Sequence, residues 1–226
     1  MSLKLVLFFL FVFSISSSFA SNAIDHAPIG VMGDHYHKTN ERMISIRYST
    51  MQMEGNSLHN NSISDQEIIT SQINPFASMS GAPSYLSVVP QKMDMKMMMI
   101  GGMYAYSDNL TYMGMMMFMK NKMTSNTYKG GMDRAYLGNF QTSLDDLSNF
   151  SFSGLYKLVE KNDNRWHLEL GIDKSIGKNN NQGLMLTPMN TYMKMTMPYP
   201  MQMDESTRLI TALTNSKNFD KFIIGT

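Results

Sequence analysis

The stretch that decides the fold is 166–173, which reads WHLELGID. Its apolar side chains occupy every second position: Trp166, Leu168, Leu170 and Ile172. Its polar or small residues occupy the positions between them: His167, Glu169, Gly171 and Asp173. A strict period of two is the pattern of a β-strand with one apolar and one polar face, and a helix cannot use it. This stretch therefore predicts a strand.

The residues before it complete a β-hairpin. Within 150–158, one parity carries Phe150, Phe152, Gly154, Tyr156 and Leu158, and the other carries Ser151, Ser153, Leu155 and Lys157. The polar sequence KNDNR at 161–165 predicts the turn. A second hairpin is predicted upstream, where 93–106 and 111–123 flank the turn-forming sequence SDNL.

Another strand is predicted at 42–53, with weaker candidates at 191–197 and 208–213. Strands of about a dozen residues exceed the usual length of about 5–6 in soluble proteins. They suit the roughly 9–11 residues that a tilted strand needs to cross a bilayer.

The connections between these strands alternate in length. Short ones are predicted at 107–110 and 161–165, and long ones at 54–92, 124–147 and 177–205. That alternation is typical of an antiparallel transmembrane β-barrel, which has short periplasmic turns and long surface loops. Aromatic residues at strand ends fit the interfacial girdles of such barrels, although aromatics are also good strand formers anywhere. They are Tyr104, Tyr106, Tyr112 and Trp166.

The N-terminus has the pattern of a secretory signal peptide. Lys4 precedes an apolar run at 5–15, and Ser18 and Ala20 occupy the small-residue positions of a cleavage site. The run is shorter than the about 20 residues of a membrane helix, and no second run of that length follows. The chain contains no cysteine, so it has no disulfide framework.

The predicted organisation is all-β: a signal peptide at 1–20, a flexible His-containing segment at 21–40, and a β-barrel domain at 41–226. Five clear strands are fewer than the eight of the smallest single-chain bacterial barrels. The final residues 218–226 lack the closing aromatic of a last barrel strand. We therefore expect a truncated barrel, without its C-terminal strands. We expect it in the bacterial outer membrane, with lipid and the barrel-assembly machinery as partners.

Catalysis has little support in the sequence. There is no G-x-S-x-G elbow, no H-E-x-x-H, no P-loop and no cysteine nucleophile, so we do not expect an enzyme. Asp145 and Asp146 are assigned to a solvated turn rather than to an acid/base pair. A net charge of +1 without a basic block gives no reason to expect a nucleic-acid partner.

Methionine is the informative residue, with 26 in the chain. One parity of the first long strand carries Met93, Met95, Met97, Met99 and Met103, and one parity of its hairpin partner carries Met113, Met115, Met117 and Met119. A three-residue turn would place the two stripes on one face, and a two-residue turn on opposite faces. The intervening Tyr112, Met116 and Phe118 fit a lipid-facing side, which leaves the methionines in the lumen.

Thioethers are soft ligands that favour Cu(I). Met-x-Met spacing recurs at 51–53, 193–197 and 201–203, and His26, His35 and His37 add imidazoles near the mature N-terminus. No cofactor is required by the sequence, and copper is the candidate ligand. The alternative is that methionine serves as an adaptable apolar filler and that His35 and His37 are only polar residues in a mobile N-terminal segment.

Several motifs resemble those of uncharacterised Gram-negative outer-membrane proteins labelled transporters, close to the barrels named after the phenol meta-degradation pathway. The resemblance runs from about 25 to 202. The matching residues are HAPIGVMGDHYH at 26–37, the pattern M-x-x-x-R-Y at 43–48, M-x-M-x-G-N at 51–56, GGMYA at 101–105, SDNLT at 107–111 and PYPMQ at 198–202. It implies an outer-membrane barrel with a transport role and an unsettled substrate. Family members continue through further strands after the position of Met203.

The leading functional hypothesis is an outer-membrane β-barrel that passes a small solute through a lumen partly lined by methionine. The alternatives are an exported Met- and His-rich copper-binding protein and a truncated, non-conducting fragment of a barrel.

Overall fold

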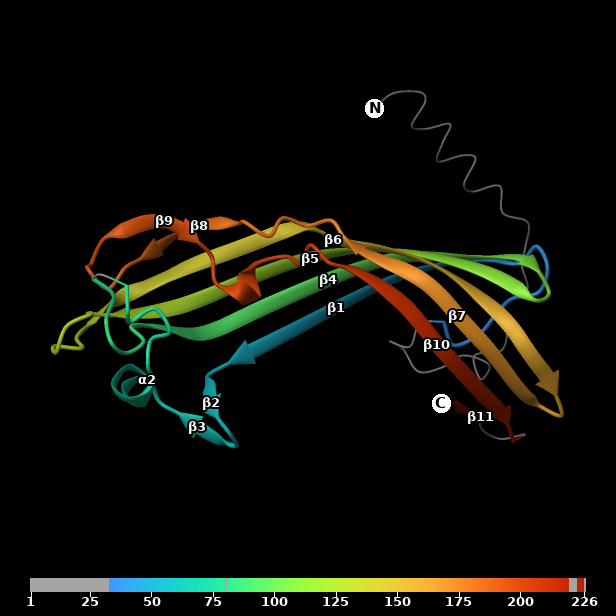
Figure 1. The fold of residues 1–226 in the computed structure, drawn as a ribbon, viewed down its shortest axis with the longest axis horizontal. Coiled ribbons are helices and arrows are strands. Elements are labelled where there is room, and N and C mark those ends of the chain that lie inside the picture. The colour runs from blue at the N-terminus through green and yellow to red at the C-terminus, as the bar shows by residue number, and fades with distance from the viewer. Residues whose placement is uncertain (1–32, 80, 220–222, 226) are drawn as a thin grey trace, which may run out of the picture.

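The computed structural model describes residues 33–79, 81–219 and 223–225, and the chain in these ranges is all-β. The main sheet is antiparallel, has seven strands in the order β1-β4-β5-β6-β7-β10-β11, and curls into a half-barrel (Figure 1). Its strands are β1 (Arg42–Glu54), β4 (Val88–Ser107), β5 (Leu110–Tyr128), β6 (Tyr136–Lys161), β7 (Asn164–Ser175), β10 (Thr207–Asn218) and β11 (Ile223–Gly225). The predicted signal peptide and His26 lie outside the described residues.

The alternation that predicted strands is confirmed by this sheet. The stretch 166–173 lies inside β7, and the weaker candidate at 208–213 lies inside β10. The predicted long connection at 124–147 is wrong over most of its length, because β5 continues to Tyr128 and β6 begins at Tyr136. These extensions carry polar residues on both faces, so they lack the apolar periodicity of a half-buried strand, yet their backbones pair continuously from Thr124↔Gln141 to Thr127↔Gly138.

The two predicted hairpins turn differently. Asn162 and Asp163 both have positive φ, 52° and 60°, as a type I′ turn requires. Asp108 and Asn109 do not, and β4 instead carries an extra residue, Tyr106, where the register shifts between Ala105 and Ser107. The bulge compensates for a turn whose twist does not match that of the strands.

Both tight turns lie at one end of the sheet, the tight-turn end, and the connections β1–β4, β5–β6 and β7–β10 lie at the other, the long-connection end (Figure 1). The smaller elements gather at the long-connection end. They are β2 (Asn56–Leu58), β3 (Asn61–Ile63), α2 (Asp65–Ser71), β8 (Gln182–Leu186), β9 (Tyr192–Thr196) and the 3-10 turn η2 (Tyr199–Met201).

Helix α2 begins at a capping box, in which Ser64 and Glu67 satisfy each other's backbone amides. Its Asp65 carboxylate accepts hydrogen bonds from Gln91, Asn126 and Tyr128 at 2.8–3.0 Å, which fixes the helix to β4 and β5. Burial raises the pKa of Asp65, but these hydrogen bonds outweigh that effect and the pKa lies below its ordinary value. Within the described ranges, no helix is long and apolar enough to cross a membrane.

Strands β1 and β11 form the two edges of the sheet, and within the described residues they do not pair with each other. Strand β11 covers only the end of β10, from Ser216 to Asn218, so most of the free edge of β10 is open as well. The sheet is therefore curled but not closed by the described strands.

Candidate functional site

One face of the sheet, here called the outer face, carries exposed apolar side chains across six strands. The face is defined by Tyr112 and Phe152, which stack with ring centroids 5.8 Å apart. Cross-strand pairing continues the band as one row through Ile46↔Ile100, Ile100↔Met116 and Met116↔Phe150. Its exposed large members are Ile44, Ile46, Tyr48, Met98, Tyr104, Tyr106, Tyr112, Met116, Phe150, Phe152, Tyr156, Leu158, Val159, Leu170, Ile172, Leu209 and Leu213.

The outer face changes character towards the long-connection end. After Phe118 the next outer residues of β5 are Lys120 and Lys122, and Lys120 forms an exposed ion pair with Asp145 of β6 at 2.7 Å. At the other boundary, Tyr104 pairs with Tyr112. The apolar band thus covers seven residues of β5, from Tyr112 to Phe118, a little fewer than the roughly 9–11 that a membrane-crossing strand needs.

Asp145 and Asp146 lie in the middle of β6 and not in a turn, so that sequence assignment was wrong. Polarity was the basis for predicting a turn at these two residues. Asp145 pairs with Lys120 on the outer face, whereas Asp146 pairs in register with Met119 on the opposite face.

The methionine stripes of β4 and β5 lie on the same face, here called the inner face. Met103 pairs with Met113, Met99 with Met117, Met97 with Met119, and Gly101 with Met115. Directly opposed residues of an antiparallel pair share a face. The turn at Asp108–Asn109 has two residues and alone would have placed the stripes on opposite faces. The extra residue Tyr106 in β4 shifts the register by one, so the stripes share a face, as they would with a three-residue turn. Met93 and Met95 extend the stripe towards the long-connection end.

The predicted imidazoles lie at the other end of the stripe. Residues 33–41 run along the inner face near the tight turns, where the His37 backbone amide donates to Thr111 Oγ1 at 3.0 Å. The rings of His35 and His37 are 4.8 Å apart, centroid to centroid. His35 Nδ1 lies 2.9 Å from Asp34 and His37 Nδ1 3.3 Å from Glu41. The structure therefore does not bring the two histidines to Met93, Met95 or Met119.

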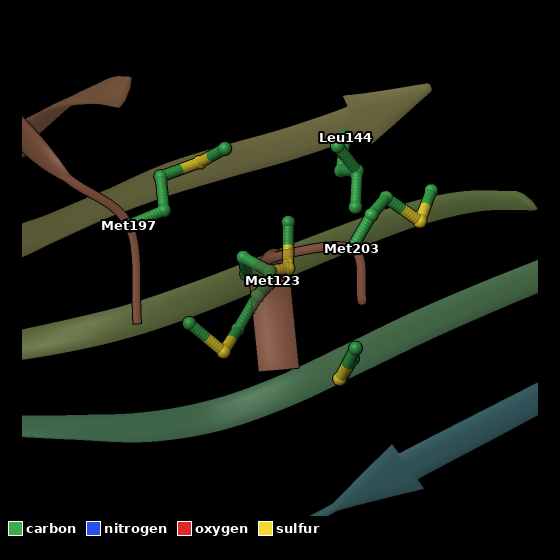
Figure 2. Close-up of a cluster of buried hydrophobic side chains, with 6 residues drawn as sticks. Met123, Leu144, Met197 and Met203 are labelled. Atoms are coloured by element: carbon green, nitrogen blue, oxygen red, sulfur yellow. The ribbon is translucent and has the colours of Figure 1, made fainter. Parts of the chain in front are cut away.

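A second set of methionines was noted in the sequence only as a loop pattern. Met197, Met201 and Met203, between β9 and β10, pack on the inner face against Met93 and Met123, and Met95 and Met119 border the cluster (Figure 2). The Met-x-Met repeat at 201–203 was the local signal for these residues. Nothing local, however, specifies that a loop about 80 residues later in the chain returns to β5.

Between β5 and β10 the inner face is mostly polar, and no site was predicted there from the sequence. His167 is buried, with Nε2 2.6 Å from the Gly33 carbonyl oxygen, and its ring stands edge-on to Tyr36. Asp173 contacts Asn149 and accepts hydrogen bonds from Arg208 at 2.7 and 3.1 Å. The signal was present in 166–173, whose polar residues all lie on this face.

The segment 33–41 is held by these groups. Gly33 has a φ of +68°, a conformation that favours glycine, and a β-carbon there would lie 2.6 Å from the Glu169 carboxylate, which would have to shift. Lys157 lies over the Tyr36 ring at 5.4 Å. Burial, and then the neighbouring Glu160 carboxylate, raise the pKa of Tyr36 to about 12, so this phenol stays protonated at neutral pH.

Within residues 33–79, 81–219 and 223–225, no group of three or more histidine, aspartate or glutamate side chains is arranged to hold a metal ion. Comparison with protein-family models, curated proteins and solved structures finds no match to this chain. The contrast between the apolar outer face and the inner face, with its methionines and polar groups, is thus the main basis for a function.

Proposed function

We propose that this protein is an outer-membrane β-barrel that passes a small solute through a lumen lined by methionine and polar side chains. The observation that carries the proposal is the contrast between the two faces of one sheet. The outer face exposes an apolar band, and the inner face carries buried hydroxyls, amides and charges. A soluble sheet of this kind would be expected to bury its apolar face and expose its polar one.

The size of the band supports a lipid-facing role. Exposed apolar patches on soluble monomers are usually limited to a few hundred Å². Here the band extends over six neighbouring strands, from Ile44 in β1 to Leu213 in β10. Membrane barrels have such a belt, with aromatic residues at its borders and polar residues in the lumen. Tyr104, Tyr112 and Trp166 lie at one border, as a girdle requires.

The inner face supplies the features of a solute path. Its β4–β5 part is lined by thioethers, and its β6–β10 part by Asn149, Asp173, His167 and Arg208. The segment 33–41 crosses this polar part close to the tight turns. Solute would therefore meet a soft, weakly polar wall on one side and a charged wall on the other.

Crossing a membrane requires that the open edges be paired, since an unpaired strand edge in hydrocarbon leaves backbone groups without partners. The proposal therefore requires further strands to pair with β1 and with β10. A closed barrel of this type resists detergent and migrates faster before heating than after it.

An exported, soluble copper-binding protein is the alternative in a different class. The exposed band disfavours it, because a soluble protein with this outer face would associate through Ile46, Phe152, Leu170 and their neighbours.

Fractionation of the cell envelope with an antibody to residues 33–225 tests the proposal. We expect the chain in the outer-membrane fraction, as a band that shifts on heating, and single-channel conductance after reconstitution. The apparent mass of the unheated band also reports whether one chain or several supply the strands. A soluble product without a heat shift would contradict the proposal.

A further inference from the structure

Five methionine side chains from three parts of the chain are buried together at the long-connection end of the inner face. Met93 of β4 and Met123 of β5 form the floor, and the segment 197–203 covers them with Met197, Met201 and Met203 (Figure 2). Their exposed fractions are between 0% and 8%. These five residues are called the methionine cluster. Leu144 is buried against them.

The covering segment is held in a defined conformation. Gln202 Nε2 donates to the carbonyl oxygens of Asn181 and Met197 at 3.0 and 2.7 Å, and its Oε1 accepts from the Asn181 amide at 2.9 Å. Asn121 Nδ2 of β5 donates to the Pro200 carbonyl at 3.3 Å. These bonds fix the backbone on both sides of Met201, so its thioether is directed towards the sheet before any ligand arrives.

Two glycines leave room for the thioethers of this segment. A β-carbon at Gly183 would lie 3.1 Å from the sulfur of Met197, and one at Gly177 would lie 2.5 Å from Met203 Cγ. Any other residue at either position would press on a methionine of the cluster. The backbone of β8 and the segment that precedes it therefore fits closely around these two side chains.

Buried oxygen atoms beside the cluster lack partners. Asn121 Oδ1 and Thr142 Oγ1 have no hydrogen-bond partner, although the two residues are only 2% and 3% exposed. Thr142 pairs in register with Met123, and Asn121 lies between the cross-strand neighbours Met95 and Leu144. A buried oxygen without a partner is costly, and a purely apolar core would not place two of them beside its sulfur atoms.

A carboxylate of β6 lies on this face next to the cluster. Asp146 pairs in register with Met119, which borders the cluster, and its side chain accepts a hydrogen bond from the Leu147 amide at 2.9 Å. Thioethers are neutral, so a single nearby carboxylate balances the charge of a monovalent cation but not that of a divalent one. The Asp146 carboxylate is therefore placed to balance the charge of a singly charged ligand.

From this arrangement we infer that the methionine cluster is a binding site for a soft monovalent metal ion, Cu(I), for which Ag(I) is a redox-stable substitute. Thioether sulfur selects Cu(I) over hard cations. Thioethers do not titrate in the physiological range, so the site keeps its ligands in acidic surroundings, where histidine ligands would become protonated. Met197, Met201 and Met203 supply ligands from the covering segment, and Met93 and Met123 supply ligands from the sheet.

The inference goes beyond the proposed channel and does not depend on it, because one chain supplies all five methionines and no closed barrel is needed to form the cluster. The competing explanation is that the methionines only fill space. Leucine replaces methionine with little change in volume, so a space-filling cluster would accept leucine without any change in metal affinity.

The test is Ag(I) titration of the full chain folded in detergent, together with Cu(I) competition against a chromogenic chelator under reducing conditions. We expect the triple variant Met197→Leu, Met201→Leu, Met203→Leu to bind at least tenfold more weakly than the wild type. The matched control replaces three exposed methionines of the same region, Met189→Leu, Met193→Leu and Met195→Leu, and should keep the wild-type affinity.

Equal affinity in the wild type and the cluster variant would overturn the inference, and so would equal losses in the cluster and control variants. Loss of binding only in the variant Met97→Leu, Met99→Leu, Met117→Leu would also overturn it, by moving the site to the middle of the stripe. Should the triple variant not fold, the single Met203→Leu variant and copper K-edge absorption of the wild type replace it. Sulfur-dominated coordination supports the site, and oxygen- or nitrogen-dominated coordination contradicts it. Conductance is measured separately, so a failed channel and a failed metal site are distinguishable.

Discussion

Met115 and Met116 are neighbours in β5, yet they meet different surroundings. Met115 lies on the inner face between Gly101 and Ser151, and Met116 lies on the outer face between Ile100 and Phe150. The outer position is one of many exposed apolar residues, and the inner one belongs to a wall that also carries hydroxyl, amide and charged groups. The comparison shows that residue type alone does not define the two faces; the parity of each strand does.

The largest expected effect comes from placing a charge at these two positions. Met116→Arg puts a guanidinium near the middle of the proposed lipid-facing band, where it should cost about 2–4 kcal/mol of folding free energy in a bilayer. Met115→Arg, one residue away, should cost roughly 0.5–1 kcal/mol because its side chain faces the lumen. Urea titration of the heat-modifiable band in lipid vesicles measures both. Equal costs would mean that the outer face does not face lipid.

A smaller effect is expected on the inner face at the tight-turn end. His167→Leu removes the partner of the Gly33 carbonyl and should weaken the contact of residues 33–41 with the sheet by about 1 kcal/mol. Hydrogen exchange of the His37 amide, which is bonded to Thr111, reports the change. Leu168→Ala on the outer face is the control and should leave that amide protected. Unchanged protection in His167→Leu would show that this contact does not hold the segment.

Helix α2 lies outside the apolar band, and its attachment to the sheet should depend on pH. Because the folded-state pKa of Asp65 lies below its ordinary value of 3.8, the carboxylate stabilises the attachment of α2 above that pH. This stabilisation is lost as the pH falls through the lower, folded-state pKa. Limited proteolysis should therefore find α2 protected at pH 7 and at pH 5, and cleavable at low pH.

Asp65→Asn should make α2 more readily cleaved at pH 7 and reduce the pH dependence, of which the Glu67 carboxylate of the capping box keeps a part. Asp133→Asn, at an exposed ion pair with Lys129, is the matched control and should change neither. Protection that persists in Asp65→Asn would show that the hydrogen bonds from Gln91, Asn126 and Tyr128 do not fix the helix.

The smallest effect is expected just outside the band. Lys120 and Asp145 are both more than half exposed, so their ion pair is solvated and contributes little to stability. Lys120→Gln should leave the urea midpoint unchanged within error, in contrast to Met116→Arg four residues earlier. A large loss in Lys120→Gln would place the hydrocarbon boundary beyond Lys120 and shift the whole band.

Much of the sheet could be predicted because strand parity is a local property. The eight residues of 166–173 are enough to predict which side chains of β7 lie on each face. In β5, the prediction that Tyr112, Met116 and Phe118 lie on the face opposite to Met113, Met115 and Met117 is confirmed by the register. The end of β5 and the beginning of β6 were not predicted as strands. Thr124, Gln141 and their neighbours are polar on both faces, so these segments lack the apolar periodicity of a half-buried strand.

The candidate site was harder to predict, because two of its determinants are not local. Whether the stripes of β4 and β5 share a face depends on one bulged residue, Tyr106, which no composition rule identifies. That Met201 returns to Met123 depends on where the β9–β10 segment lies, and this is fixed by contacts such as Asn121 with Pro200. The spacing of the methionines identified the stripes, but it did not predict that the methionines of 197–203 pack against those of β4 and β5.

The central claim, that the outer face meets lipid, is tested most directly by the fluorescence of Trp166, the only tryptophan in the chain. It pairs with Val159 and Asn215 on the outer face, at the tight-turn border of the band. In vesicles of brominated lipids, we predict strong quenching by bromines near the headgroups, weaker quenching by bromines deep in the acyl chains, and little quenching by aqueous acrylamide. Efficient acrylamide quenching with no effect of the brominated lipids would contradict the account.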